Sequence, residues 1–533
     1  MTPSHSERKA YLVGGGIAAL AAAVYLVRDG GFRGRDVRIL EQAALGGSLD
    51  AAGSAAQGYS MRGSRMYGAA YVLMYELLSH IPSLDDPAKS VTQDTLAFWA
   101  EAPWDDRARL VEGGRVVDAA AFGLSDRGRV DLIGLMLRGE AELGARPIDE
   151  CFDADFFASH FWLMWSSMFG FETWHSAAEL RRYLLRFLRL FPDLPTLKIV
   201  QSTRYNGRDS IVRPIVRWLE ERGVQFDTGL RVTDLSFEPL ADGRKAVRRI
   251  HARRAGADGD AEADIAVAPQ DFVIVTLGSM TADSTLGSMG APPPPPPTGD
   301  RRSGAWPLWE RLAAQDPAFG RPAAFCGDVG RTKWVTFTVT HADDRFARRM
   351  AAFSGSAPGR GGLVTIKDSS WRLTFHLFHP PAYPDQPPGT QVWWGYGLFA
   401  DRTGDFVRKS MPECSGREIL TELFSHLGWQ GELPALLEGA NCVPCLLPYT
   451  TSQFMPRAAG DRPPVVPPGT ANLAFVGQYV EIPDNTVYTV EYSVHAAALA
   501  VATLLGAPGV VPPAYHGLDH PHALVGAIRR VLD

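Results

Sequence analysis

The sequence predicts an α/β protein organised around a Rossmann-like, dinucleotide-binding domain. The apolar run Tyr11–Val13 leads directly into three glycines, Gly14–Gly16. A second apolar run, Val37–Leu40, ends in the acid Glu41. A strand, a glycine turn, a helix and a second strand closed by a carboxylate form the βαβ unit that binds the ADP half of a dinucleotide.

The first strand–helix turn has the residues that a pyrophosphate site needs. Gly14 allows the tight turn, Gly16 lets the backbone approach the phosphates, and Ala19 takes the third small position, where the helix meets the sheet. Free N–H groups and the helix dipole favour negative charge at this helix N-terminus, which includes Ile17 and Ala18.

A carboxylate about 20 residues beyond the turn suits the ribose diol of a dinucleotide. Glu41 holds this position and would repel a 2′-phosphate. The alternative is an ordinary strand–helix turn without a ligand, but such a turn needs neither the two framing strands nor the terminal acid.

Composition narrows the class of protein. A chain of 533 residues is too long for one small core, so several subdomains are expected. The net charge of -6 offers no general attraction to nucleic acid. Residues 1–9 lack the apolar core of a secretory signal, and no apolar run approaches the roughly 18 residues that span a bilayer, so we expect a cytoplasmic protein. Cys442–Cys445 has redox or zinc spacing, but no second pair or nearby histidines complete a ligand set. We expect a structural role there and no metal.

Further elements follow along the chain. A helical pattern from Tyr67 to His80 should end before Pro82, because proline removes a donor and breaks the helix. Residues 130–190 read as helices rich in aromatic side chains, which are usually core. A helix is predicted over 211–219. Three later runs predict strands that extend the nucleotide-binding sheet: 224–226, 229–235 and 272–276.

The second half of the chain begins with a domain boundary. Six consecutive prolines, Pro292–Pro297, mark a stiff, exposed linker. Beyond it, 333–340 and 392–397 look like strands of a second domain. Residues 474–478 repeat the strand–glycine pattern, and a helix of small residues is predicted over 489–504.

Several motifs occur in the order in which one protein family carries them. They are Gly46–Asp50, Met61–Arg65 running to Ile81–Leu84, Trp174–Ser176 followed by Arg181–Tyr183, Gly278–Thr281, Val364–Ser369, Pro448–Arg457 and Gly477–Pro483. From about residue 9 to 505 the chain resembles the FAD-containing fatty-acid hydratases typified by oleate hydratase, once called myosin-cross-reactive antigens.

The resemblance implies a discontinuous FAD-binding domain with a mixed α+β substrate domain and a helical subdomain. The expected parts are FAD-binding segments at 1–98, 201–290 and 458–505, a helical cap at 99–200, the proline-rich linker at 291–304, the substrate domain at 305–457 and a C-terminal tail at 506–533.

The family adds water across a cis double bond of an unsaturated fatty acid, of the oleate to 10-hydroxystearate type, with bound FAD and no net redox change. The alkene must be protonated at one carbon while water attacks the cation developing at the other, so the site needs a buried acid and an acceptor for a water proton. The family's donor is the Tyr of an Arg-Arg-Tyr motif, here Tyr183, for which a core tyrosine is the alternative. Trp174 is expected to line the same pocket, and His175 is expected in the core.

The proton acceptor is a departure from the family. The family's water-activating Glu lies in an Arg-Gly-Gly-Arg-Glu-Met segment, and an ungapped count from Arg62 to Leu84 puts Met66 at its position. Methionine accepts no proton. Water is then activated by a flavin atom or a neighbouring carboxylate, or it attacks a well-developed cation with little help. Loss of the hydration chemistry is the remaining alternative.

The residues that hold the fatty-acid carboxylate also differ. A Gln, a Thr, an Asn and a His of better-known members correspond here to Gly207, His376, Phe378 and Ala382. Asn206 and His376 are the expected substrate-binding residues. A buried carboxylate needs a partner. The cationic candidates in the same stretches are Arg204, Arg208, Arg372, His376 and His379, each of which has a solvated surface charge as its alternative.

The flavin-binding residues follow the resemblance more closely. Glu41 should hold the ribose, and Val232 should contact adenine through its backbone. Ser279 should end a strand at the ligand edge of the sheet. The residues expected to pack against pyrophosphate and flavin are Gly47, Ser48, Arg62 and Gly63, and those expected to approach the flavin are Asp484 and Thr489.

Two other functions stay open at this stage. A redox flavoenzyme of the fatty-acid oxidase, amine oxidase or desaturase type would bleach its flavin during turnover. A non-catalytic lipid-binding flavoprotein would bind fatty acid without converting it. Residues 523–532 form an apolar helix with two arginines, suited to peripheral membrane contact or, more commonly, to docking on the protein's own surface. A monomer or a homodimer is expected.

Overall fold

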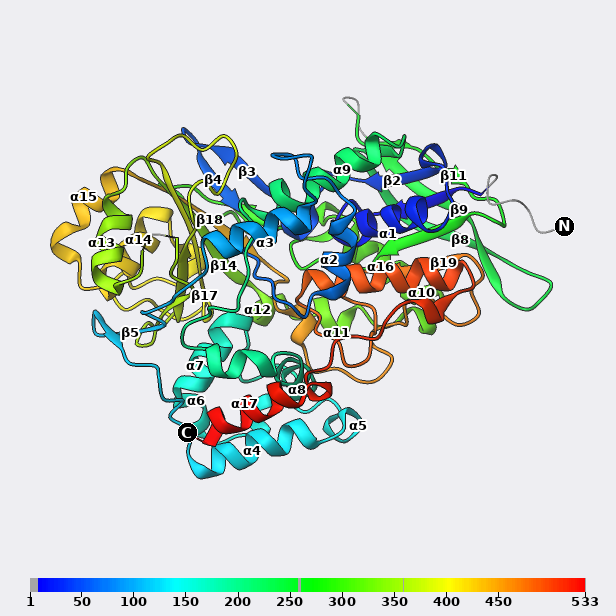
Figure 1. Cartoon of the computed structure of the whole chain (residues 1–533). Coiled ribbons are helices and arrows are strands. Elements are labelled where there is room, and N and C mark those ends of the chain that lie inside the picture. Colours follow the sequence, from blue (N-terminus) through cyan, green and yellow to red (C-terminus); the bar gives the residue numbers. More distant parts are fainter. Residues whose placement is uncertain (1–7, 257–259, 358, 533) are drawn as a thin grey trace.

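The computed structural model describes residues 8–256, 260–357 and 359–532. The first seven residues, which belong to the segment expected to carry no secretory signal, lie outside this range. Figure 1 shows a nucleotide-binding domain on the right, a sheet domain on the left and a helical region below both.

The nucleotide-binding domain contains a five-stranded parallel sheet with the strand order β19-β12-β1-β2-β7. Its strands are β1 (Ala10–Val13), β2 (Val37–Glu41), β7 (Gln225–Thr228), β12 (Phe272–Thr276) and β19 (Leu473–Val476). Helices α1 (Ile17–Arg28) and α16 (Val490–Leu504) pack on each other and on this sheet. The predicted α/β class and the discontinuous Rossmann-like sheet are confirmed, because strands from three distant parts of the chain pair here.

One predicted strand does not join this sheet. Residues 229–235 belong to β8 (Leu230–Pro239), which forms a separate antiparallel sheet with β9 (Lys245–Arg254), β10 (Ala261–Glu262) and β11 (Ile265–Ala266). The expectation that this strand extends the nucleotide-binding sheet is therefore wrong. Only alternate residues at the start of β8 are fully buried, whereas β1 is buried throughout. A strand inside a parallel sheet must be covered on both faces.

The sheet domain contains a mixed eight-stranded sheet in which only β15 and β5 run parallel. In order across the sheet, the strands are β13 (Thr285–Leu286), β18 (Ala440–Leu447), β14 (Trp334–His341), β17 (Gln391–Gly397), β16 (Leu373–Leu377), β15 (Val364–Ile366), β5 (Leu110–Glu112) and β6 (Arg115–Val117). The two strands predicted beyond the prolines are confirmed. The hairpin β5–β6 comes from the segment expected to be helical, and Pro292–Pro297 adopts neither helix nor strand.

Helices cover the sheet domain and flank the nucleotide-binding sheet. On the sheet domain they are α13 (Arg345–Ser354), α14 (Gly416–His426) and α15 (Leu433–Glu438). Elsewhere they are α9 (Arg213–Glu220), which follows the π-helix η6 (Arg208–Val212), α10 (Ala305–Gln315), α11 (Ala323–Cys326) and α12 (Val329–Thr332). The hairpin β3 (Ala51–Ser54)–β4 (Gly58–Met61) packs on β14. Cys442 and Cys445 are buried free thiols on β18, in keeping with a structural role.

The helical region forms the base of the molecule. Its helices are α4 (Asp126–Leu137), α5 (Glu140–Leu143), α6 (Ala154–Ala158), α7 (His160–Phe169), α8 (Ala177–Arg186) and the 3₁₀ segment η5 (Leu188–Asp193), with α3 (Val91–Glu101) above them. Helix α2 (Val72–Ser79) ends before Pro82, as predicted, but begins five residues later than expected because 67–71 form a turn.

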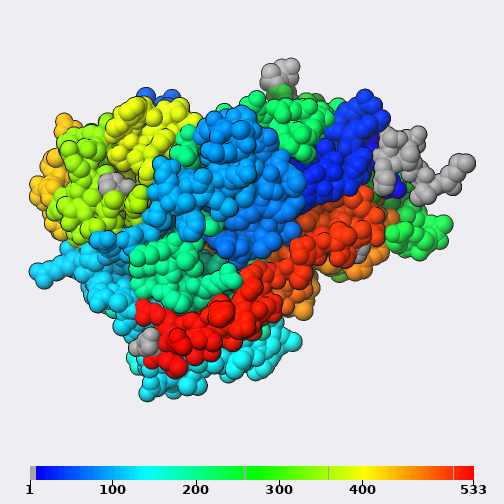
Figure 2. Space-filling model, in the orientation of Figure 1, coloured from blue at the N-terminus to red at the C-terminus, as the bar shows by residue number. Residues whose placement is uncertain are grey.

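The C-terminal helix α17 (Pro521–Leu532) packs against η5 and buries Ala523, Ala527 and Val531. Figure 2 shows the C-terminal segment as a continuous band against the helical region. The opposite side of α17 exposes Val525 and Ile528. Within the described part of the chain, no helix has both the length and the apolar character needed to cross a membrane.

Candidate active site

A cleft of about 440 Å³ opens where β1, β2 and β12 end, at the edge where doubly wound sheets bind ligands. We call it the nucleotide cleft. Gly16 caps α1 without a side-chain hydrogen bond, and the first turn of α1 carries no acid, so no side chain competes with an anion for its N–H groups. A Cβ on Gly47 would lie 3.2 Å from the Cα of Gly16, so the two backbone segments that form the floor of the cleft approach closely because Gly47 has no side chain.

The carboxylate of Glu41 is fixed at this cleft by the backbone. Its Oε2 accepts the N–H of Gly15 at 2.6 Å, and its Oε1 accepts the N–H of Ala43 at 2.8 Å. Burial raises the pKa of Glu41, while these backbone donors oppose the rise. Each oxygen keeps a second lone pair, which a ribose hydroxyl can use.

Most of the predicted cofactor-binding residues meet at the cleft. Its lining includes Gly14, Gly16, Ile17, Ala18, Glu41, Gly47, Ser48, Arg62, Val232 and Ser279. Ala19 is fully buried in α1, and Gly63 lines a neighbouring cavity. Thr489 caps α16 by accepting the N–H of Tyr492 at 3.1 Å. Asp484 lies outside the cleft lining, with its side chain 58% exposed and 3.8 Å from Arg181.

A second cavity, of about 340 Å³, lies between the helical region and the sheet domain. We call it the apolar cavity. Its wall includes Met66, Trp99, Phe169, Tyr183, Trp334, Trp394, Tyr396 and Thr489. It adjoins the nucleotide cleft, because Arg65 in its wall donates to the carbonyl of Ser48 in the cleft at 2.9 Å. The first turns of α16 also separate the two spaces, with Val490 facing one and Ser493 the other.

Tyr183 presents a buried phenol to the apolar cavity. The residue is 0% exposed, and its hydroxyl oxygen accepts the backbone N–H of Tyr488 at 2.9 Å. Phe169 and Phe171 hold the ring edge-on, each with centroids 5.1 Å away. Burial raises the pKa of Tyr183 well above its ordinary value. The phenol is therefore protonated at neutral pH, and its proton is not used by any hydrogen bond among the described residues.

A buried ion network holds the helix that carries Tyr183. Glu179, one turn before Tyr183 on α8, accepts from Arg462 at 2.8 Å and lies 3.0 Å from Arg457. Burial would raise the pKa of Glu179, but Arg462 and Arg457 hold it below its usual value. Arg182 adds bonds of 2.7 Å to Glu140 and Glu481. The network ties α8 to the segment before α16, which supplies the N–H of Tyr488.

Met66, at the position of the family's Glu, lies in the wall of the apolar cavity. Among the described residues of this wall, none is Asp, Glu, His or Lys. Glu491, two residues after Thr489, is buried, but its two carboxylate oxygens accept the N–H groups of Leu73 and Met74 and so cap α2. The wall thus offers no carboxylate to activate water.

A small side cavity of about 40 Å³ shares Ser64, Arg65 and Tyr67 with the apolar cavity. Its wall includes Asn206, Gly207, Arg204, His376, Phe378, His379 and Ala382, and no acidic side chain among the described residues. The amide of Asn206 is engaged within the protein, donating to Ala382 and Asp209.

Gly207 packs closely against Leu49. A Cβ on Gly207 would lie 3.0 Å from a terminal methyl of Leu49, so a larger side chain there requires Leu49 to move. Arg204 has its guanidinium 5.1 Å from the ring of Phe98, and none of the described carboxylates forms an ion pair with it. Arg208 instead donates to the carbonyl of Ala51.

The residues around Trp174 lie elsewhere. Trp174 is absent from the walls of the three cavities described, and Arg331 lies 4.3 Å from its ring. His175 is fully buried and accepts the N–H of Glu172 at 2.8 Å through Nδ1. Burial lowers the pKa of His175, as expected of a core histidine.

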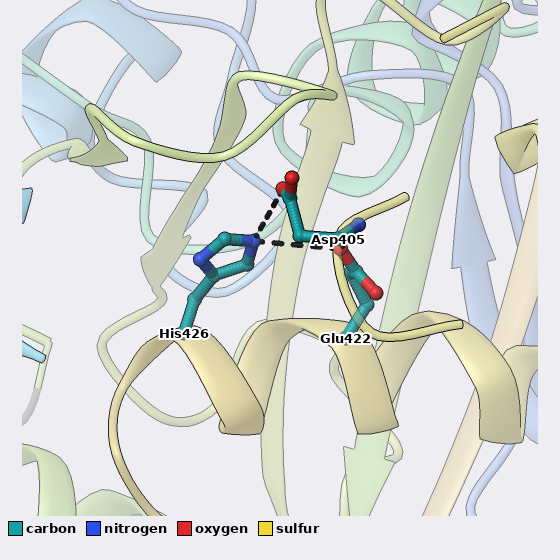
Figure 3. Close-up of side chains that lie close together, drawn as sticks. All are labelled: Asp405, Glu422 and His426. Atoms are coloured by element: carbon teal, nitrogen blue, oxygen red, sulfur yellow. Dashed lines mark hydrogen bonds and ion pairs between the residues drawn. The ribbon is translucent and has the colours of Figure 1, made fainter. Parts of the chain in front are cut away.

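One further cluster consists of side chains of the kinds that bind metal ions. Asp405, Glu422 and His426 lie together on α14 and the preceding loop, with ligand atoms within 4.8 Å of one another (Figure 3). The carboxylate of Glu422 accepts three backbone N–H groups, from residues 405–407, and Asp405 accepts two bonds from Ser370. These bonds hold the loop that carries Asp405 against α14.

Fold and site together define an α/β protein with a Rossmann-like parallel sheet, in which the nucleotide cleft adjoins an apolar cavity with a buried phenol. The family model described as the MCRA family matches residues 7–502, and the chain belongs to this family. It is 38% identical over 527 residues to an oleate hydratase of Streptococcus pyogenes serotype M49 (strain NZ131), covering 96% of this chain and 87% of the relative. It is 29% identical over 573 residues to a linoleate hydratase of Lactiplantibacillus plantarum, covering 99% of both chains.

Solved structures share the fold at low sequence identity. A cyclohexylamine oxidase of Brevibacterium oxydans IH-35A superposes with a TM-score of 0.52 at 12% identity, covering 94% of this chain and 99% of the other. A putative protoporphyrinogen oxidase of Exiguobacterium sp. 255-15 gives a TM-score of 0.51 at 13% identity over the same shares. These likenesses concern the fold alone.

Proposed function

We propose that this protein is a fatty-acid hydratase that adds water to a cis double bond, with FAD held in the nucleotide cleft and no net redox change. The observation that carries the proposal is the phenol of Tyr183, which is buried at the apolar cavity with its proton free. Membership of the MCRA family and similarity to two named hydratases support the same reaction.

The apolar cavity accounts for the chemistry at the alkene. Tyr183 donates its proton to one alkene carbon, and a cation develops at the other. The rings of Trp334 and Trp394 lie in the wall, and aromatic rings stabilise a nearby cation through their quadrupoles. The N–H of Tyr488 stabilises the phenolate that remains. Water adds to the cation and gives the hydroxy acid after losing a proton.

The nucleotide cleft fits the ribose and the pyrophosphate of FAD. Glu41 would hold the ribose, and Gly14, Gly16 and the first turn of α1 would receive the pyrophosphate. Arg62 and Thr489 would lie toward the flavin. When bound, the flavin supplies a planar, polarisable ring system beside the apolar cavity.

Gly16→Val is expected to leave the apoprotein folded while weakening FAD binding. The backbone at Gly16 is extended, and the nearest atom to an added Cβ is 3.9 Å away, so the first side-chain carbon is accommodated without strain. Its side chain would project where the pyrophosphate must approach. We expect at least about a tenfold rise in the Kd for FAD, equal to about 1.4 kcal/mol. Titration of the apoprotein with FAD, followed by flavin fluorescence, measures this Kd. An unchanged Kd would contradict the assignment of the nucleotide cleft as the FAD site.

The side cavity is proposed to hold the fatty-acid carboxylate. Arg204 has no acidic partner among the described residues of this cavity wall. Because a charge-assisted bond contributes about 1.5 to 3 kcal/mol, Arg204→Gln is expected to raise KM for oleate about 10-fold to 100-fold. KM for methyl oleate should not change. Arg213→Gln, which removes a half-exposed charge paired with Asp209, is the control.

The function itself is tested by incubating the FAD-loaded protein with oleic and linoleic acids in the absence of oxygen and identifying products by mass spectrometry. A hydratase forms hydroxy acid under these conditions without permanent flavin bleaching. Product that appears only with oxygen or another electron acceptor would favour a redox flavoenzyme, and tight binding without product would favour a lipid-binding protein.

Helix α17 is the segment that we propose to contact a membrane surface. Its outer face exposes Val525, Ile528 and Leu532, and it carries Arg529 and Arg530 in its last turn. This combination suits an anionic lipid surface, which is where a water-insoluble fatty acid would be met.

A further inference from the structure

A serine hydroxyl lies where the apolar cavity meets the side cavity. Ser64 lies two residues before Met66 and lines both the apolar cavity and the side cavity. In the family segment Arg-Gly-Gly-Arg-Glu-Met, the residue at this position is glycine. The chain therefore lacks the family's carboxylate at Met66 but carries a hydroxyl close to it in sequence.

Ser64 is connected to a buried histidine. Its Oγ lies 3.4 Å from Nε2 of His376, a residue 312 positions away that is 1% exposed. Burial lowers the pKa of His376 to about 3, so the imidazole is neutral at physiological pH. Nδ1 of the ring has no hydrogen-bond partner among the described residues. With the ring proton on Nδ1, Nε2 accepts the hydrogen bond from Ser64.

We propose that Ser64 and His376 replace the family's carboxylate as the proton acceptor for the attacking water. This inference rests on the proposed function. Tyr183 gives its proton to the alkene, and the O–H bond breaks as the C–H bond forms. The water oxygen forms the C–O bond and passes one proton to Oγ of Ser64, which passes its own proton to Nε2 of His376. The alkene gains the elements of water, and no electron leaves the site.

A weak base is sufficient for this step. Water that attacks a cation becomes strongly acidic, so the acceptor need not be basic before the attack. The imidazolium of His376 forms in the same turnover as the phenolate of Tyr183, so the net charge of the site does not change. Return of the proton from His376 to Tyr183 restores the starting state. The hydrogen bond of 3.4 Å is long, as catalytic bonds often are before substrate binds.

The experiment uses FAD-loaded variants and measures kcat, KM and oleate affinity separately. Ser64→Ala is expected to lower kcat about 10²-fold, the lower range for general base catalysis, with KM and oleate Kd within about twofold. Ser64→Thr keeps the hydroxyl and should keep most activity. His376→Gln keeps an acceptor for Ser64 but takes up no proton, so it should lower kcat like Ser64→Ala. Ser60→Ala, whose hydroxyl is bonded to a carbonyl on β3, is the matched control.

Restoring the carboxylate provides the decisive comparison. Adding Met66→Glu to the Ser64→Ala variant is expected to recover at least about tenfold of the lost kcat, because the new acid takes over the water proton. Full activity of Ser64→Ala, or an inactive double variant that still binds FAD and oleate normally, would overturn the proposed relay. If the unmodified protein forms no hydroxy acid, the proposed function fails instead.

Discussion

Replacing Tyr183 with Phe is expected to lower kcat for hydration about 10³-fold, within the range of a lost general acid. The substitution keeps the buried ring and its contacts with Phe169 and Phe171. It removes only the hydroxyl, and it leaves the N–H of Tyr488 without its acceptor. FAD content and oleate Kd should therefore stay close to those of the unmodified protein, and the loss should appear in kcat rather than KM.

The pH profile gives an independent check on the same residue. Burial raises the pKa of Tyr183 well above its ordinary value, and the donor must be protonated, so alkaline pH should not reduce kcat through this group in the range where an ordinary tyrosine loses its proton. Tyr59→Phe removes a hydroxyl bonded to Asp385, outside the apolar cavity wall, and serves as the control. A Tyr183→Phe enzyme with unchanged kcat would remove Tyr183 from the mechanism.

Replacing Glu179 with Ala is expected to lower the free energy of unfolding by about 3 to 5 kcal/mol, because it leaves buried charges uncompensated. Arg462 and Glu179 both have fully buried side chains, and Arg457 lies 3.0 Å from the same carboxylate oxygen. Urea unfolding of the FAD-loaded protein at neutral pH measures the change. Glu221→Ala, which removes a half-exposed pair with Arg217, should change stability by less than about 1 kcal/mol.

The stability contributed by Glu179 also depends on pH. Burial would raise its pKa, but the arginines hold the folded-state pKa below the unfolded value. The contribution is therefore fully present above the unfolded pKa and is lost as pH falls through the folded pKa. The stability difference between the unmodified protein and Glu179→Ala should shrink on acidification. A difference that stays constant at low pH would contradict an ionic role.

The parts of the fold that depend on local sequence were predictable. Gly14, Gly16 and Glu41 lie within one βαβ unit, so their spacing alone identifies the nucleotide cleft. Strand β8 was misassigned because the sequence of a strand does not reveal its partner. Its alternation of Leu230 and Val232 with Arg231 and Thr233 fits burial on one face, but the pairing with β9 became visible only in the structure.

The site was predictable only where a motif marks it. The Arg-Arg-Tyr motif points to Tyr183, but its partner is the backbone N–H of Tyr488, for which side-chain identity carries no signal. Ser64 and His376 are separated by 312 residues, and neither is unusual alone. The serine in place of glycine beside Met66 was the available signal. The position of Asp484 at the surface could not be inferred from its neighbours.

The most direct test of hydration at Tyr183 is the reaction of oleic acid in D₂O containing water labelled with a heavy oxygen isotope, under anaerobic conditions. The product should carry one labelled oxygen and one carbon-bound deuterium on the adjacent former alkene carbon. Tyr183→Phe should abolish both labels together. Oxygen that does not come from water, or hydroxylation without deuterium at the neighbouring carbon, would contradict protonation and hydration of the alkene.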